Sequence, residues 1–111
     1  MRVNFKFLTL LLVMSFTTIA FIACAGPPDE LIMTAEAAVN HASAAGADEF
    51  SPKLFNKAEA LLQEAKMLNE KGDYEAAKKK AEFAIIRAEK AEKNANRLDA
   101  ARQRDREGGD E

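Results

Sequence analysis

An unbroken heptad-type repeat in the C-terminal half of the chain restricts its fold more than any other feature. Small or apolar residues recur there at alternating steps of three and four: Tyr74, Ala77, Ala81, Ala84, Ala88, Ala91, Ala95 and Leu98. This spacing places all of them on one face of an α-helix, which Ile85 widens. Most are alanine, which favours helix strongly but buries little area. The repeat therefore predicts one long helix that other helices approach closely.

Two shorter helices are expected before the long one. Over residues 28–45 an apolar stripe recurs at steps of three and four, and Gly46 follows where a helix C-terminal glycine belongs. Ser51 and Pro52 are residue types preferred at the N-cap and the first position of the next helix. The first stripe is Leu31, Ala35, Ala38, Ala42 and Ala45, and the second is Leu54, Ala58, Leu61, Leu62, Ala65 and Leu68.

The second and third helices are joined by a tight turn at Gly72 and Asp73. Gly72 can adopt the left-handed conformation that ends a helix, and Asp73 can cap the helix that follows. So short a turn predicts an antiparallel hairpin. The expected fold class is an all-α, antiparallel three-helix bundle, alanine-rich, with a helical hairpin, an N-terminal helix and a long last helix. We assign the helical domain to residues 29–102 and, because the periodicity is lost, a disordered tail to residues 103–111.

The last helix is expected to outrun its partner beyond about Lys93, because it is about ten residues longer. The segment from Ala95 to Leu98 would then project unpaired and contact a partner. Phe83 and Ile86 fall off the main stripe. They either cover the first helix or form a surface for another chain. These four residues are the candidate partner-binding residues.

The first 23 residues have the pattern of a secretory signal. Arg2 and Lys6 form a basic start, and an uncharged run follows from Phe7. The segment Phe21-Ile22-Ala23-Cys24-Ala25-Gly26 resembles a bacterial lipobox, in which the cysteine thiol is lipidated and becomes the new N-terminus. Cys24 would then hold the body to a membrane through its lipid, with residues 24–28 as the spacer.

The alternative is an uncleaved transmembrane helix. The uncharged run from Phe7 to Pro28 is about long enough to span roughly 30 Å of hydrocarbon. Because Arg2 and Lys6 would stay inside, both interpretations place the body outside the cytoplasm.

Composition argues against several classes of function. After residue 23 the chain holds 18 acidic and 14 basic residues, a mild mixed charge with no nucleic-acid footprint. Its single histidine, His41, lies two residues from Ser43, which points to another helix face. No cluster has metal-ligand spacing, and there is no phosphate-binding glycine loop. We therefore expect no enzymatic activity, no cofactor and no small-molecule substrate.

Several consecutive motifs resemble one known family. They are Ala-Asp-Glu-Phe-Ser-Pro from Ala47, Ala-x-x-Leu-Leu-x-Glu-Ala from Ala58, Lys-Gly-Asp-Tyr-Glu-x-Ala from Lys71, and Ala-Glu-x-Ala from Ala81. Together with the cysteine start, they are similar to domain of unknown function 4398, small helical lipoproteins of the Gram-negative envelope. In many relatives an OmpA-like, peptidoglycan-binding domain follows. The sequence up to Glu111 shows no such domain, so we do not carry wall binding over.

The hairpin also resembles a single tetratricopeptide unit, with Leu61, Ala65, Leu68, Gly72, Asp73, Tyr74, Ala77 and Ala84 at matching places. One unit cannot form the concave groove of an array. The expected function is therefore a membrane-anchored envelope lipoprotein, on the periplasmic face of an outer membrane, with a structural or assembly role through helix packing. It would contact an envelope protein or a second copy. The alternative is a tetratricopeptide-like module that captures a protein or cell-wall partner.

Overall fold

The computed structural model describes residues 4–9 and 26–109. Residues 5–9 are helical, and the remaining helices are α2 (Asp29–Ala44), α3 (Ala47–Phe50), α4 (Pro52–Glu70) and α5 (Tyr74–Gly108). No strand occurs in either described range. Among these residues, no helix is both long enough and apolar enough to cross a membrane. Cys24, the predicted signal and the alternative membrane helix lie largely outside the described residues.

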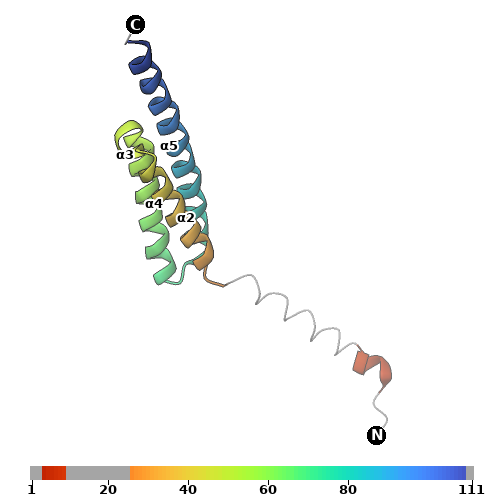
Figure 1. Cartoon of the computed structure of the whole chain (residues 1–111). Coiled ribbons are helices and arrows are strands. Elements are labelled where there is room, and N and C mark those ends of the chain that lie inside the picture. Colours follow the sequence, from red (N-terminus) through yellow and green to blue (C-terminus); the bar gives the residue numbers. More distant parts are fainter. Residues whose placement is uncertain (1–3, 10–25, 110–111) are drawn as a thin grey trace.

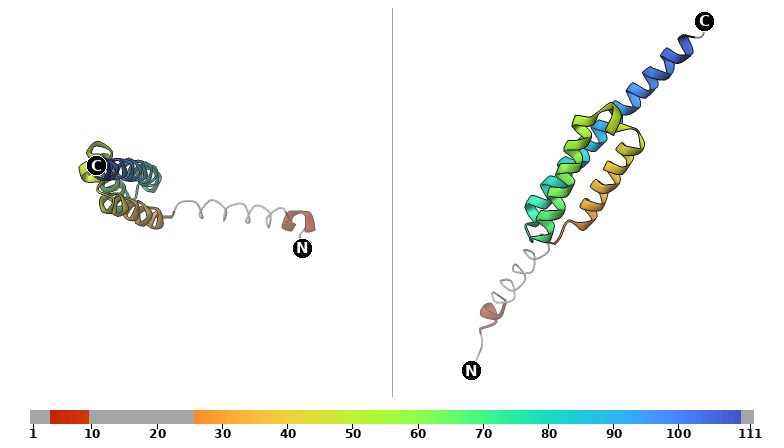
Figure 2. Two further views of the ribbon diagram at one scale, coloured as in Figure 1. Left: turned by 45° about the horizontal axis from the view of Figure 1, so that its top comes forward. Right: turned by 90° about the vertical axis from the view of Figure 1, so that its left-hand side faces the viewer.

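The three long helices form an antiparallel bundle, as the sequence predicts (Figure 1). α2 and α5 run in one direction and α4 runs in the other. The long helix α5 packs against all three other elements of the bundle. It continues past the end that α2, α3 and α4 share, whereas its own start lies level with the start of α2 (Figure 2). The all-α fold with a long last helix is thus confirmed.

The inner face of α5 is built from alanine. The alanine seam, which we define as the six alanines of the predicted repeat, is wholly inaccessible at 0% exposure: Ala77, Ala81, Ala84, Ala88, Ala91 and Ala95. The two ends of the repeat differ, since Tyr74 is half-buried and Leu98 is exposed. Larger side chains from α2 and α4 fill the space that the alanines leave, among them Ile32, Val39, Phe55, Leu61 and Leu62. The core is therefore asymmetric: α5 contributes only alanine to the buried cluster, whereas α2 and α4 contribute both large residues and alanines.

The buried stripes of α2 and α4 are rotated slightly from the predicted ones. In α2 the buried residues are Ile32, Ala35, Val39 and Ala42, whereas Leu31, Ala38 and Ala45 are only partly buried. In α4 Phe55 is buried and Leu54 is partly buried. Each helix packs against two neighbours, so its apolar face is broader than one stripe. This breadth explains why a single three-and-four series did not locate its centre.

Both predicted glycine stops are present. Gly46 and Gly72 have φ of 81° and 83°, in the left-handed region that favours glycine. At the end of α4, the Gly72 N–H donates to the Asn69 carbonyl (3.1 Å) and the Asp73 N–H to the Leu68 carbonyl (2.9 Å), a Schellman arrangement. Asp73 caps α5 as predicted, because its Oδ1 accepts from the Ala76 N–H at 3.3 Å. Ser51 occupies the N-cap position of α4, but its side chain makes no capping hydrogen bond.

The far end of the bundle contains two differences from the prediction. The short helix α3 was not foreseen; it packs against α5, with Ala47 fully buried. In addition, α5 remains helical to Gly108, so the helix does not end near Gln103. The residues there are good helix formers, and a hydrogen bond from Gln103 Nε2 to Asp99 Oδ2 (3.2 Å) spans one turn. The structure thus places residues 103–108, which the sequence analysis assigns to the tail, in an exposed last part of α5.

Candidate interaction surfaces

The residues weighed for catalysis or metal binding are not brought together. His41 and Ser43 are both exposed on α2. Within residues 4–9 and 26–109, no group of three or more His, Cys, Asp or Glu side chains could hold a metal ion. The surfaces of the bundle are therefore considered as places for contact with other molecules.

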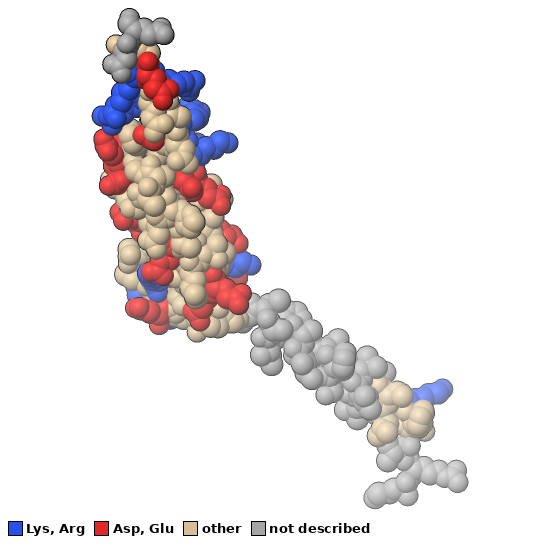
Figure 3. Space-filling model, viewed as in Figure 1, with Lys and Arg blue, Asp and Glu red and all other residues tan. Residues whose placement is uncertain are grey.

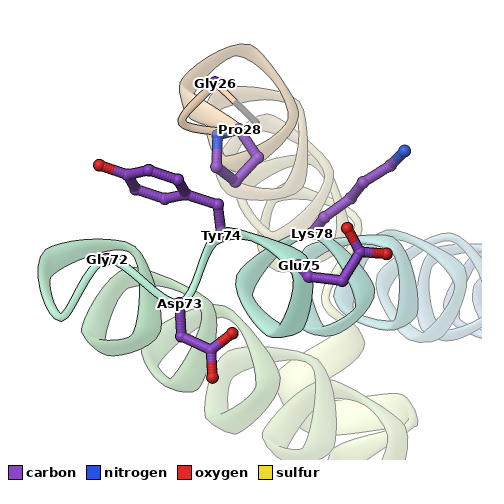
Figure 4. Close-up of a pocket in the computed structure, with 7 residues that line it drawn as sticks. All are labelled: Gly26, Pro28, Gly72, Asp73, Tyr74, Glu75 and Lys78. Carbon is purple, nitrogen blue, oxygen red and sulfur yellow. The ribbon is translucent and has the colours of Figure 1, made fainter. Parts of the chain in front are cut away.

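At one end of the bundle, which we call the turn end, the start of α2 lies beside the turn between α4 and α5. A recess of about 320 Å³ there is lined by Gly26, Pro28, Gly72, Asp73, Tyr74, Glu75 and Lys78 (Figure 4). A second recess of about 750 Å³ lies between α2 and α5 and shares Gly26, Pro28 and Lys78 with the first. The Gly72 turn and the start of α2 therefore lie side by side. Gly26 stands two residues after Cys24.

Polar contacts between helices fasten this half of the bundle. Asn69 Nδ2 donates to Asp29 Oδ1 at 2.9 Å, which joins the end of α4 to the start of α2. Lys66 Nζ lies 2.7 Å from Glu36 Oε1, between the same two helices. These pairs are exposed, so each contributes little to stability, but together they fix the lateral position of α4.

The third contact joins α4 to α5. Lys80 Nζ lies 2.6 Å from Glu64 Oε2, and both side chains are about two-fifths exposed. The hydrogen bond from Lys80, together with its positive charge, lowers the pKa of the Glu64 carboxyl below its ordinary value. Lys57 lowers the pKa further by a smaller amount. The pair therefore favours the charged carboxylate at neutral pH.

The four candidate partner-binding residues do not form one surface. Phe83 and Ile86 are 54% and 55% exposed on the outer side of α5, so they do not cover the first helix. Leu98 is 46% exposed, whereas Ala95 is fully buried. The expectation that Ala95 projects unpaired is wrong, because the unforeseen α3 extends the bundle and packs on α5. The unpaired part of α5 begins closer to Leu98.

The junction between α3 and α5 is polar at its edge. Arg102 Nη1 lies 3.5 Å from Glu49 Oε1, and its guanidinium carbon is 5.8 Å from the centroid of the Phe50 ring. Arg102 thus contacts α3 through both charge and the aromatic face. Figure 3 shows basic side chains on both sides of the free end of α5, above a bundle whose visible face carries many acidic side chains.

The outer side of α5 carries a second regular series that the sequence interpretation missed. It repeats the four-and-three steps of the alanine seam on the opposite face, and all its members are exposed: Lys79, Phe83, Ile86, Lys90, Lys93, Arg97, Ala100 and Arg104. We call this set the basic stripe. It was missed because only Phe83, Ile86 and Ala100 of the series are apolar. The other five members are basic residues at heptad spacing, so the pattern is mainly one of charge.

Comparison with known proteins gives one match. The family model described as a domain of unknown function, DUF4398, covers residues 30–106. No curated protein and no solved structure matches the chain. The matched residues include α3 and α4, most of α2 and α5, and the Gly46 and Gly72 turns. The chain belongs to the DUF4398 family of domains of unknown function.

Proposed function

We propose that this protein is an envelope lipoprotein, anchored through lipid on Cys24 to the periplasmic face of an outer membrane. Its role is structural or assembly-related and non-enzymatic, and it acts through the packing of helices against an envelope partner. The resemblance of residues 21–26 to a lipobox and the basic start of the chain support the anchor.

The position of Gly26 is the observation that carries the proposal. Gly26 lines the turn-end recess with Gly72 and Tyr74, and it stands two residues after Cys24. A lipid at residue 24 would therefore attach the bundle by one end rather than by its side. The free end of α5 lies at the opposite end of the bundle (Figure 1). Such a molecule would present the outer faces of its helices to the periplasm.

A second candidate function is a binding module of the tetratricopeptide-like kind. The α4–α5 hairpin, closed by the Gly72 turn, supports it. The exposed apolar pair of Phe83 and Ile86 lies on the outside of this hairpin, where it would meet a ligand. Sedimentation separates the two: a self-associating chain favours the structural role, and a monomer that retains a partner favours the binding module.

The anchor is tested by labelling cells with a radioactive fatty acid. Wild-type protein is compared with Cys24→Ala and with Ser43→Ala, a control at an exposed position of α2. Because Cys24 is the single cysteine of the chain, a stable label must reside there. We expect label in wild type and Ser43→Ala and none in Cys24→Ala. An unlabelled wild-type protein that stays in the membrane as firmly as Cys24→Ala would instead support the transmembrane alternative.

A further inference from the structure

The basic stripe is unusual in the uniformity of its charge. Five of its eight members are basic and none is acidic, although residues 26–109 as a whole hold more acidic than basic residues. Lys79, Lys90, Lys93, Arg97 and Arg104 take part in none of the three ion pairs found within the described residues. Their charges are therefore available to another molecule.

The same stripe contains the two large exposed apolar side chains of this face. Phe83 and Ile86 are consecutive members, one turn apart, and each leaves more than half of its surface in water. Solvent exposure of a phenylalanine beside an isoleucine is unfavourable, because removal of apolar surface from water lowers the free energy. Covering this pair would stabilise a complex, and the basic residues that follow it would orient the partner.

We infer that the basic stripe of α5 is the docking surface for an acidic amphipathic helix of a partner protein. The partner helix places apolar side chains over Phe83 and Ile86. It places carboxylates opposite Lys90, Lys93 and Arg97. The inference deepens the helix-packing part of the proposed function and rests on that part alone, since it does not require the lipid anchor.

The spacing of the stripe favours a helix as the occupant. Steps of four and three residues keep a straight line on an α-helix and match the contact line of a second helix that crosses it at a shallow angle. From Lys79 to Arg104 this line is about 38 Å long, at 1.5 Å per residue. A partner helix of three to four heptads would follow all of it.

A second copy of the chain is a poor occupant. In a parallel pair, Lys90, Lys93 and Arg97 would face their own equivalents across the contact. In an antiparallel pair centred on Phe83 and Ile86, Lys79 would face Lys90. Both arrangements bring like charges together with two apolar residues to offset them.

An anionic membrane fits less well than a helix. Glu75, Glu82 and Glu89, seven residues apart and all exposed, run along one edge of the stripe. A flat anionic surface that reached the lysines would also meet these carboxylates. A partner helix is narrow, so it can carry basic residues along the one edge that faces Glu75, Glu82 and Glu89. These carboxylates would then determine which way the partner helix runs along α5.

The inference is tested with the full chain in detergent micelles and a fluorescent synthetic helix. Along the face that would contact α5, the probe carries leucine at two consecutive heptad positions and glutamate at the remaining ones. Its binding is followed by fluorescence anisotropy. We compare wild type with the triple variant Lys90→Glu, Lys93→Glu and Arg97→Glu. Reversal of three attractive contacts should weaken binding roughly tenfold or more.

A matched control separates the surface from the total charge. Lys53→Glu, Lys57→Glu and Lys71→Glu make the same change of charge at exposed positions of α4 and its C-terminal cap. This control should keep the wild-type affinity within about threefold, since its sites lie off the stripe. A second probe, with lysine in place of each glutamate, should bind the α5 triple variant more tightly than wild type. That gain would also show that the variant is folded.

Four results would overturn the inference. The first two are that the acidic probe does not bind, or that both triple variants lose the same amount of affinity for it. The third is that the wild-type protein forms a dimer that the three substitutions on α5 dissociate. The fourth is that vesicles containing phosphatidylglycerol bind the protein through the basic stripe while the probe does not bind. None of these results concerns lipid on Cys24. Failure here is therefore distinguishable from failure of the anchor, which the labelling experiment measures.

Discussion

At the scale of single residues, two glycines have the same backbone conformation but different surroundings. Gly46 and Gly72 both have φ near +80°, where any L side chain is strained. A Cβ at Gly72 would meet no atom within 4 Å, whereas at Gly46 it would lie 3.3 Å from Cδ2 of Phe50. Gly46 thus serves both the end of α2 and the close approach of the Phe50 ring.

Alanine substitution should separate these two effects. Gly72→Ala should lower the free energy of unfolding by about 1 kcal/mol through backbone strain alone. Gly46→Ala should lower it further, because the Phe50 ring must also move. Gly108→Ala, at a helical position with open space around it, should leave it nearly unchanged. Urea unfolding followed by circular dichroism measures all three, and equal losses for Gly46→Ala and Gly72→Ala would contradict this account of Gly46.

At the scale of the helices, α5 packs against the rest of the bundle through a face whose buried side chains are the methyl groups of alanine. The alanine seam is fully buried against α2, α3 and α4, so each of these helices approaches its backbone closely. Interiors packed this tightly tolerate added volume poorly. The seam explains how a bundle with few large apolar residues excludes water from its centre.

A larger residue in the seam should therefore be more harmful than the same residue outside it. Ala88→Leu should lower the free energy of unfolding by about 1–3 kcal/mol, because the extra atoms force neighbouring helices apart. Glu89→Leu, one position further and exposed, should change it by less than about 0.5 kcal/mol. Thermal and urea unfolding of the two variants provide the comparison. A stable Ala88→Leu protein would show that α5 does not approach its neighbours as closely as described.

The contact between α4 and α5 predicts a dependence on pH. The pKa of Glu64 is lowered in the folded protein, chiefly by the hydrogen bond and charge of Lys80. The stabilisation is thus present above the unfolded-state pKa and is lost as the pH falls through the folded-state pKa. In Lys80→Met the pKa of Glu64, followed by carbon NMR of its carboxyl group, should rise toward its ordinary value. Lys79→Met, whose lysine is exposed on the outer face, should leave it unchanged, and a rise in both variants would contradict the assignment to Lys80.

Local signals in the sequence were sufficient for the longest elements and insufficient for the shortest. α4, the start of α5 and the turn between them follow from Pro52, Gly72 and Asp73, each of which acts on its immediate neighbours. α3 has four residues, too few to show a period, and its place depends on packing against distant residues of α5. The error at Ala95 came from α3. The basic stripe was legible in the sequence, but as charge rather than as hydrophobicity.

At the scale of the whole molecule, the bundle has two unlike ends. The turn end gathers the start of α2 and the α4–α5 turn, and the other end is the free part of α5 (Figure 2). From residue 74 to residue 104, α5 is about 45 Å long. In the proposed lipoprotein the turn end lies near the membrane, and the distal half of the basic stripe stands away from it.

This orientation predicts a gradient of distance from the lipid surface. Fluorophores are attached in vesicles to Asp73→Cys or to Arg104→Cys, with Cys24 already acylated and unreactive. A quencher on lipid head groups should quench the label at residue 73 strongly and the label at residue 104 weakly. Equal quenching at the two positions would mean that the bundle lies along the membrane, against the end-on arrangement.

Everything proposed about the anchor depends on one proposed modification, the lipidation of Cys24 as the N-terminus of the mature protein. The most direct measurement is the mass of the intact protein extracted from membranes, together with the mass of its N-terminal peptide. We expect residues 1–23 to be absent and Cys24 to carry a diacylglyceryl group. A protein that begins at Met1 with an unmodified thiol at Cys24 would contradict it.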